Sequence, residues 1–308
     1  GIVGVGNVGA TLAFTLATKD ICSSILLKDQ RENITQAMAL DISQATNAAN
    51  SKTVIYACLN DEEFNNCDVI VITAGIARKP GMSRDDLLLI NAQIMQAVLE
   101  DIKKYAPNSK IIIVSNPLDA MVYAALKILK FPREHVIGMA GILDSARMSH
   151  FICEKLGYGA GQIESSVMGG HGDAMVPLVN YSTVAGVSLP ELLSKEDIED
   201  IVTKTKNGGL QIVKLLETGS AYYAPAHATS LMVEAILHNT RKIYPCSVML
   251  DGEYDCKNVV SGVPVMLGSN GIEKIIELKL NEEQKELFAN SVASVQELID
   301  TLDEKFFI

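Results

Sequence analysis

Three polar side chains in the second half of the chain have the types and spacing that proton transfer requires. Asp144 and Arg147, within AGILDSARMSHF, lie three residues apart at an expected helix start and therefore on neighbouring positions of one face. His171, within VMGGHGDAMVP, follows an expected strand, and its flanking glycines leave the ring free to project into a cleft. Alone, His171 would be better explained as a structural residue. Together with LDSAR, it indicates acid-base chemistry on an anion, because a carboxylate favours charged histidine and a guanidinium matches a carboxylate.

Two arginines lie six residues apart in an expected loop. The stretch TAGIARKPGMSRDDLL places Arg78 and Arg84 on either side of Pro80 and Gly81, just before an apolar helical pattern that runs from Arg84 to Tyr105. Proline restricts the backbone and glycine frees it, so this loop has one stiff point and one pivot, and its two arginines could face a bound ligand. The alternative is that both arginines are solvated surface charges.

A glycine-rich segment opens the chain. GIVGVGNVGATLAF has the spacing G-x-G-x-x-G at Gly4, Gly6 and Gly9, between an expected strand and an expected helix. Such a turn lets a pyrophosphate approach the backbone at a helix N-terminus. Asp29 ends the next expected strand, where a carboxylate binds a ribose diol and repels a 2′-phosphate, so we expect NAD rather than NADP. The alternatives are tight-turn glycines beside a helix-capping Asp29, or an FAD or S-adenosylmethionine protein, since both share this opening.

The expected elements change in character near residues 139 to 144. Before that point, apolar runs such as CDVIVITAG alternate with amphipathic segments, a pattern typical of a parallel sheet covered on both faces. After it we expect mixed helices and strands, including a strand from Leu178 to Ala185 and a final helix started by Asn281. The predicted fold class is α/β, with a doubly wound Rossmann domain at residues 1–140 and a mixed α+β catalytic domain at residues 141–308. Ligand clefts tend to lie at such a junction.

Composition narrows the classes of partner. A chain of 308 residues with 48% hydrophobic residues can bury a core large enough for about two domains. The net charge of −11 disfavours nucleic acid and anionic membrane surfaces as partners. No apolar run approaches the ~18 residues of a membrane-spanning helix. The six cysteines lack metal-ligand or disulfide-framework spacing, so we expect no metal site and a reducing, cytoplasmic location.

Taken in order, GVGNVG, LLKD, TAGIARKPGMSR, SNPLD, LDSAR and GGHGD resemble the lactate/malate dehydrogenase family over essentially the whole chain. The resemblance implies that His171 is the acid-base group, that Asp144 orients and charges it, and that Arg147 holds the substrate's reacting-end carboxylate. It also implies that Arg84 polarises the substrate carbonyl and that Asn116 binds the same oxygen region. The residues implied for the NAD site are Gly4, Gly6, Asn7, Val8, Gly9, Asp29, Thr73, Ala74, Gly75, Asn91, Ser115 and Asn116. Because the family includes both states, we expect a homodimer or a homotetramer.

Arg78 is the residue expected to select the substrate. Arginine at this position resembles the malate dehydrogenases of the family, and glutamine resembles the lactate dehydrogenases. Oxaloacetate carries a second carboxylate where pyruvate has a methyl group, and burying that charge without a partner costs several kcal/mol. We therefore expect NAD-dependent oxidation and reduction of a small dicarboxylate, malate or oxaloacetate. The alternatives are an L-lactate or dual-specificity 2-hydroxy acid dehydrogenase, a catalytically idle NAD-binding protein and, for Arg78, a solvated charge like Lys79.

Overall fold

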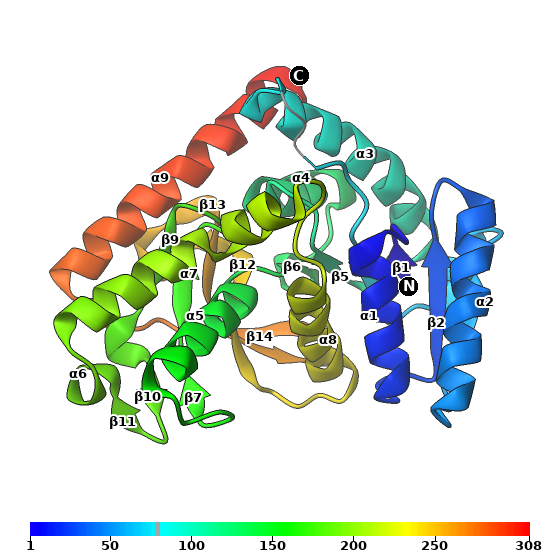
Figure 1. Cartoon of the computed structure of the whole chain (residues 1–308). Coiled ribbons are helices and arrows are strands. Elements are labelled where there is room, and N and C mark those ends of the chain that lie inside the picture. Colours follow the sequence, from blue (N-terminus) through cyan, green and yellow to red (C-terminus); the bar gives the residue numbers. More distant parts are fainter. Residues whose placement is uncertain (78–80) are drawn as a thin grey trace.

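The structure is a computed structural model that describes residues 1–77 and 81–308. Parallel strands form the sheet of the first half (Figure 1): β1 (Ile2–Val3), β2 (Ser24–Lys28), β3 (Val54–Ala57), β4 (Val69–Ile72), β5 (Lys110–Ile113) and β6 (Val136–Gly138). They lie in the order β3-β2-β1-β4-β5-β6, and each neighbouring pair is parallel. This is the strand order of a doubly wound dinucleotide-binding sheet.

The sequence of β4 shows why this sheet is covered on both faces. All four residues of the run VIVI are buried. Val69 and Val71 pack into the apolar core on one face, whereas Ile70 and Ile72 pack into the core on the other. Side chains alternate between faces with a period of two, so a continuous apolar run needs helices on both sides.

Helices supply that cover. The core on one face includes residues of α1 (Asn7–Thr18), α2 (Glu32–Ala48) and α8 (Tyr223–Leu237), and the core on the other includes residues of α3 (Arg84–Tyr105), α4 (Leu118–Leu129) and α9 (Glu282–Lys305). The 3₁₀ helix η1 (Asp61–Asn66) connects β3 to β4, and η2 (Arg133–His135) connects α4 to β6. As predicted, α3 runs from Arg84 to Tyr105, with a capping box between Ser83 and Asp86, and α9 starts after its N-cap Asn281. The end of α9 lies beside the start of α3 (Figure 1), where Lys305 forms an ion pair with Asp85.

The second half extends the same sheet with antiparallel strands. Beyond β6 the order continues with β12 (Ile243–Asp251), β13 (Lys257–Gly268), β8 (Val167–Gly169) and β9 (Met175–Pro177), and β14 (Gly271–Ile275) pairs with β13. A small separate sheet contains β7 (Ile163–Glu164), β10 (Thr183–Val184) and β11 (Val187–Ser188). The helices of this half are α5 (Gly141–Leu156), α6 (Leu189–Leu192) and α7 (Lys195–Leu216), with 3₁₀ helices η3 (Val179–Tyr181) and η4 (Glu253–Asp255). The predicted fold class, a Rossmann domain followed by a mixed α/β domain, is confirmed.

One strand prediction was wrong over most of its length. The segment from Leu178 to Ala185 contains η3 and only the two-residue strand β10. The Ser182 hydroxyl donates a 2.9 Å hydrogen bond to the Leu178 carbonyl, so the backbone turns instead of extending. Serine side chains often compete with ladder hydrogen bonds in this way. Across residues 1–77 and 81–308, each helix is too short or too polar to span a lipid bilayer.

Candidate active site

The turn between β8 and β9 carries His171 to the start of α5. The two strands are antiparallel, with Gly169 opposite Met175, so the connection between them is short. His171 Nδ1 lies 2.8 Å from Asp144 Oδ2, and Arg147 Nη1 donates a 2.8 Å hydrogen bond to Asp144 Oδ1. Asp144 is 1% exposed and lies in the first turn of α5, where the helix dipole favours an anion. The structure thus brings together three of the residues predicted for the reacting end, His171, Asp144 and Arg147.

Asp144 determines which nitrogen of His171 is available for proton exchange. A carboxylate only accepts hydrogen bonds, so Nδ1 carries the hydrogen and Nε2 is left for a substrate. Burial of the ring, whose side chain is 13% exposed, by itself lowers the pKa of His171. The charge and hydrogen bond of Asp144 outweigh burial and the opposing charge of Arg147, so the pKa is raised above its ordinary value. His171 therefore stays protonated to a higher pH than an isolated histidine.

Arg147 keeps part of its guanidinium free of protein partners. Its Nη1 is bound to Asp144, whereas the buried Nε has no hydrogen-bond partner among the described residues. Helix α7 approaches this group at Gly208 and Gly209, and a Cβ at position 209 would lie 3.2 Å from Arg147 Nη2. Glycine in a helix costs roughly 1 kcal/mol relative to alanine, but here it leaves room for the guanidinium. A buried, unpaired donor is what an incoming carboxylate can satisfy.

The glycine-rich turn between β1 and α1 is tightly packed. Gly4 has a φ of +96°, a conformation that favours glycine. A Cβ on Gly9 would lie 1.9 Å from the Gly4 carbonyl oxygen, so only glycine fits there. By contrast, no described atom lies within 4 Å of a Cβ built on Gly6. The turn therefore leaves open space at the N-terminus of α1, where unpaired N–H groups favour anions.

Asp29 directly follows β2 and is tied to this turn. Its Oδ2 accepts a 3.0 Å hydrogen bond from the Val5 N–H, and its Oδ1 accepts a 3.2 Å bond from the Arg31 N–H. Partial burial favours the neutral acid, but these bonds and the Arg31 guanidinium outweigh it and lower the pKa of Asp29. The carboxylate is therefore ionised at neutral pH, which is the form that repels a 2′-phosphate.

A pocket of about 460 Å³ opens at the carboxyl ends of the parallel strands. The predicted cofactor-site residues that line it are Gly4, Gly6, Asp29, Thr73, Ala74 and Gly75. Thr73 Oγ1 donates a 2.8 Å hydrogen bond to the Gly4 carbonyl, and Ser115 Oγ donates a 2.5 Å bond to the Ala74 carbonyl. These bonds join the segments that follow β1, β4 and β5. Open α/β sheets bind their ligands at this edge, so the pocket has the position and lining that a dinucleotide requires.

Other residues predicted for the cofactor site lie beside this pocket. Asn7 and Val8 begin α1. Asn91 is buried in α3, where its Oδ1 accepts a 2.8 Å bond from the Ile76 N–H and its Nδ2 donates to the Ile76 and Asn116 carbonyls at 3.1 and 2.6 Å. Because backbone groups bind both the oxygen and the nitrogen of this amide, Asn91 holds together the loops that follow β4 and β5.

Among the described residues, Arg84 and Asn116 form no hydrogen bond or ion pair with the Asp144–His171 pair. Arg84 is the exposed first residue of α3, and within the described part of the chain its side chain forms no ion pair or hydrogen bond with this pair. Asn116 is also exposed and precedes Pro117 in a cis peptide bond. Arg78 lies outside the described residues. The substrate contacts of these three residues stay predictions.

Sequence reasoning missed two features of the reacting end. Asp119 accepts a 2.8 Å hydrogen bond from the His171 backbone N–H at its Oδ2. The available signal was a carboxylate in the first turn of the mostly apolar helix LDAMVYAALKIL. The pair Gly208–Gly209 was also overlooked, although adjacent glycines inside a helical pattern often mark close packing.

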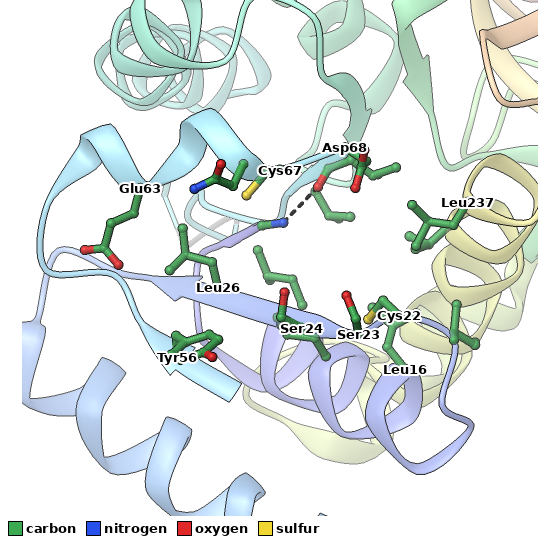
Figure 2. A pocket seen from close by; sticks show the side chains of 18 of the residues that line it. Leu16, Cys22, Ser23, Ser24, Leu26, Tyr56, Glu63, Cys67, Asp68 and Leu237 are labelled. Atoms are coloured by element: carbon green, nitrogen blue, oxygen red, sulfur yellow. Dashed lines mark hydrogen bonds between the residues drawn. The ribbon is translucent and has the colours of Figure 1, made fainter. Parts of the chain in front are cut away.

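A second cavity lies at the opposite edge of the parallel strands (Figure 2). Its volume is about 540 Å³, and Cys22, Ser24, Cys67 and Asp68 are among its lining residues. There the Gly1 backbone nitrogen donates a 2.8 Å hydrogen bond to the Val69 carbonyl. None of the predicted site residues lines this cavity, as far as the described residues go. Volume alone therefore does not identify the site, whereas the grouping of charged and hydrogen-bonding side chains does.

The fold and the site define a class of protein. Strand order, glycine-rich turn and Asp29 are those of a dinucleotide-binding domain, and a second domain adds a buried Asp–His pair. Residues 1–138 match the lactate/malate dehydrogenase NAD binding domain, and residues 142–306 match the lactate/malate dehydrogenase alpha/beta C-terminal domain. The chain belongs to the lactate/malate dehydrogenase family, as its motifs predicted.

Individual relatives are similar over nearly their full length. A malate dehydrogenase of Aliarcobacter butzleri is 63% identical over 307 residues, which cover 100% of this chain and 98% of the relative. A malate dehydrogenase of Sulfurimonas denitrificans is 59% identical over 308 residues, covering 100% of this chain and 97% of the relative. Among solved structures, the apo malate dehydrogenase of Picrophilus torridus is 41% identical with a TM-score of 0.96, covering 99% of this chain and 97% of that one.

Proposed function

We propose that this chain catalyses the NAD-dependent interconversion of malate and oxaloacetate. The observation that carries the proposal is the buried Asp144–His171 pair beside the partly unpaired Arg147. The similarity of this chain to malate dehydrogenases over its whole length supports the choice of substrate. The cluster argues against an idle NAD-binding protein, because burying charges is costly even when they are paired, and buried charged groups with shifted pKa values concentrate at functional sites.

The residues that would hold NAD are those at the carboxyl ends of the parallel strands. The glycine-rich turn and the start of α1 would bind the pyrophosphate, and Asp29 would accept hydrogen bonds from the adenosine ribose. Thr73, Ala74 and Gly75 line the same pocket. When bound, the cofactor supplies a hydride to oxaloacetate or accepts one from malate.

His171 would exchange the proton. The substrate oxygen gains negative charge as the ketone is reduced, so it needs a proton donor. His171 Nε2 donates that proton, while Asp144 keeps Nδ1 hydrogen-bonded and the ring oriented. In malate oxidation the neutral ring takes the proton back.

Three further side chains would bind the substrate. Arg147 would pair its unpartnered Nε and neighbouring N–H groups with the carboxylate next to the reacting carbon. Arg84, at the start of α3, would polarise the carbonyl, and Asn116 would bind the same oxygen. Closure of the preceding loop would exclude water and strengthen these interactions.

Arg78 would read the second carboxylate of the substrate. A bidentate, charge-assisted pair is worth roughly 1.5–3 kcal/mol, which corresponds to discrimination of about 10–100-fold. Pyruvate would leave this arginine desolvated against a methyl group, so the mismatch also disfavours the wrong substrate. This argument favours dicarboxylate over monocarboxylate 2-oxo acids.

The test compares NADH oxidation with oxaloacetate and with pyruvate in the wild type, Arg78→Gln and the neighbouring control Lys79→Gln. We expect kcat/KM to favour oxaloacetate, and Arg78→Gln to erode that preference by about 10–100-fold, with Lys79→Gln unchanged. A wild type that prefers pyruvate, or an Arg78→Gln variant with unaltered preference, would overturn the assignment. Failure with both substrates would overturn the activity itself.

We also propose a division into an NAD-binding domain at residues 1–140 and a catalytic domain at residues 141–308, because α5 begins directly after β6, the last parallel strand.

A homodimer or homotetramer is supported by large exposed apolar side chains: Leu40 on α2 is 62% exposed, Leu215 on α7 is 78% exposed and Tyr223 on α8 is 70% exposed. A partner that covers such side chains would remove apolar surface from water. Light scattering of the purified protein would measure its mass and so distinguish a dimer from a tetramer. The cysteine spacing, which does not match a disulfide framework, supports a cytoplasmic location.

A further inference from the structure

Asp119 is a buried acid in the first turn of α4, and its side chain reaches two other elements. It is 4% exposed. Its Oδ2 accepts a 2.8 Å hydrogen bond from the His171 N–H, in the turn after β8. Its Oδ1 accepts a 2.6 Å hydrogen bond from the Ser247 hydroxyl of β12, which is fully buried. The carboxyl group therefore connects the first half of the chain to the strand and the turn that carry the reacting end.

The turn that holds His171 depends on few contacts of this kind. The ring is held by Asp144 from α5, and the backbone N–H of Gly170 donates a 2.7 Å bond to Ser291 Oγ from α9. Gly169 and Gly172 have φ values of +80° and +120°, so the backbone on both sides of His171 is intrinsically free to adopt many conformations. The hydrogen bond between the His171 ring and Asp144 fixes only the direction in which Nδ1 points. Ser291 holds the main chain one residue earlier, and the bond to Asp119 is the side-chain contact that holds the main chain at His171 itself.

We propose that Asp119 is a positioning residue for proton transfer, acting through the backbone of His171 with Ser247 as its support. The inference rests on the proposed role of His171. Small displacements matter here, because a shift of about 1 Å in a reacting group can lower a rate by 10²-fold. Loss of the acceptor would also leave the His171 N–H without a partner in a partly buried position.

This positioning role requires a hydrogen-bond acceptor for the His171 N–H at the place of Asp119 Oδ2. Burial by itself raises the pKa of Asp119, the hydrogen bonds from Ser247 and the His171 N–H oppose that effect, and the pKa is raised overall. An ionised or a neutral carboxyl group can accept the His171 N–H at Oδ2. Asparagine can also do so through its amide oxygen, while its amide NH₂ donates to Ser247 Oγ. Asp119→Asn therefore preserves the positioning bond, and Asp119→Ala removes it.

A matched control lies on the same helix. The Tyr123 hydroxyl of α4 donates a 2.7 Å hydrogen bond to Asp303 Oδ2 of α9. Tyr123→Phe removes a tertiary hydrogen bond that joins α4 to α9 and involves neither His171 nor Asp144. It reports what a purely structural loss in this helix does to activity.

The experiment measures kcat with oxaloacetate, the KM for NADH and Tm for these three variants, and repeats Asp119→Ala in a His171→Asn background. We expect Asp119→Ala to lower kcat by about 10–100-fold with the KM for NADH unchanged, Asp119→Asn to retain most of kcat, and Tyr123→Phe to keep wild-type kcat. In the His171→Asn background, Asp119→Ala should cause no additional loss, because the two residues act as a unit.

Two outcomes would overturn the inference: wild-type kcat in folded Asp119→Ala, or a fully additive loss in the His171→Asn background. If Asp119→Ala does not fold, Ser247→Ala takes its place, since it removes the support of the carboxyl group and should lower kcat without changing the KM for NADH. Wild-type kcat in Ser247→Ala would then overturn the inference. Full activity of His171→Asn alone would instead refute the proposed role of His171.

Discussion

The two ends of the candidate site are built in different ways. The cofactor end is shaped mainly by backbone: the turn from Gly4 to Gly9 leaves room beside the N-terminus of α1, and the segments after β1, β4 and β5 meet there through bonds to backbone carbonyls, so N–H groups are expected to do most of the binding. The reacting end combines side chains from α5, α4 and the β8–β9 turn. His171 is 27 residues from Asp144 and 52 from Asp119.

This difference determines how each end is expected to respond to a substitution. At the cofactor end an added methyl group meets backbone, which cannot move away, so steric fit is decisive. At the reacting end the groups are buried charges that stabilise one another, and removing one leaves another without a partner. The first end should fail by losing affinity and stability, and the second by losing catalytic rate.

The largest expected effect is at the reacting end. Replacing His171 by asparagine removes the proton donor and should lower kcat for oxaloacetate reduction by roughly 10²–10⁴-fold, while NADH affinity stays unchanged. Steady-state kinetics and fluorescence titration with NADH measure the two quantities. His150→Asn is the control, because His150 is exposed on the same helix as Asp144. A parallel loss of NADH affinity would contradict the separation of the two ends.

A smaller effect is expected from methyl groups at the cofactor end. Gly9→Ala places a Cβ 1.9 Å from the Gly4 carbonyl oxygen, so it should lower the free energy of unfolding by about 1–3 kcal/mol. Gly6→Ala should leave that free energy nearly unchanged, because the described atoms leave open space around its Cβ, yet weaken NADH binding if a pyrophosphate approaches there. Urea denaturation of the ligand-free protein and NADH titration test both variants. Equal stability of the two variants would count against the steric account.

The smallest effect is a pH dependence that should appear at one end only. His171 must be protonated to reduce oxaloacetate, and its pKa is raised above the ordinary value of about 6.5. The reduction rate should therefore persist above that pH and then fall by up to about tenfold per pH unit, while malate oxidation rises over the same range. The charged groups that act on His171 are Asp144 and Arg147 of α5 and Asp119 of α4.

Saturating rates in both directions, together with NADH affinity, would be measured across this range. NADH affinity should not follow the same curve, because the pKa of Asp29 is lowered and its carboxylate stays ionised. Identical pH trends for reduction and oxidation would argue against His171 as the proton carrier.

Much of the fold was predictable because the relevant forces are local. The run VIVI predicted a strand buried on both faces, and the apolar helical pattern from Arg84 to Tyr105 predicted α3. The strand expected from Leu178 to Ala185 failed because a side-chain hydrogen bond from Ser182, invisible in the apolar pattern, turned the backbone. Local periodicity cannot reveal a competing side-chain bond.

For the candidate site, the residue types were predictable and most of their contacts were not. The i,i+3 spacing of Asp144 and Arg147 placed them on one helix face, because helix geometry sets that distance. Their pairing with His171 was expected only by resemblance to a family. The contact between Asp119 and Ser247, 128 residues apart, was not anticipated.

By itself, the sequence determined the glycine-rich turn, the acid that follows the second strand and the helical pairing of Asp144 with Arg147. Each depends on steric or spacing rules that act over a few residues. Only the tertiary structure decided that the β8–β9 turn brings His171 to Asp144, that Asp119 holds its backbone and that Gly209 leaves room for Arg147. The physical reason is that these contacts depend on how the sheet and helices pack together, and packing follows from the burial of the whole core.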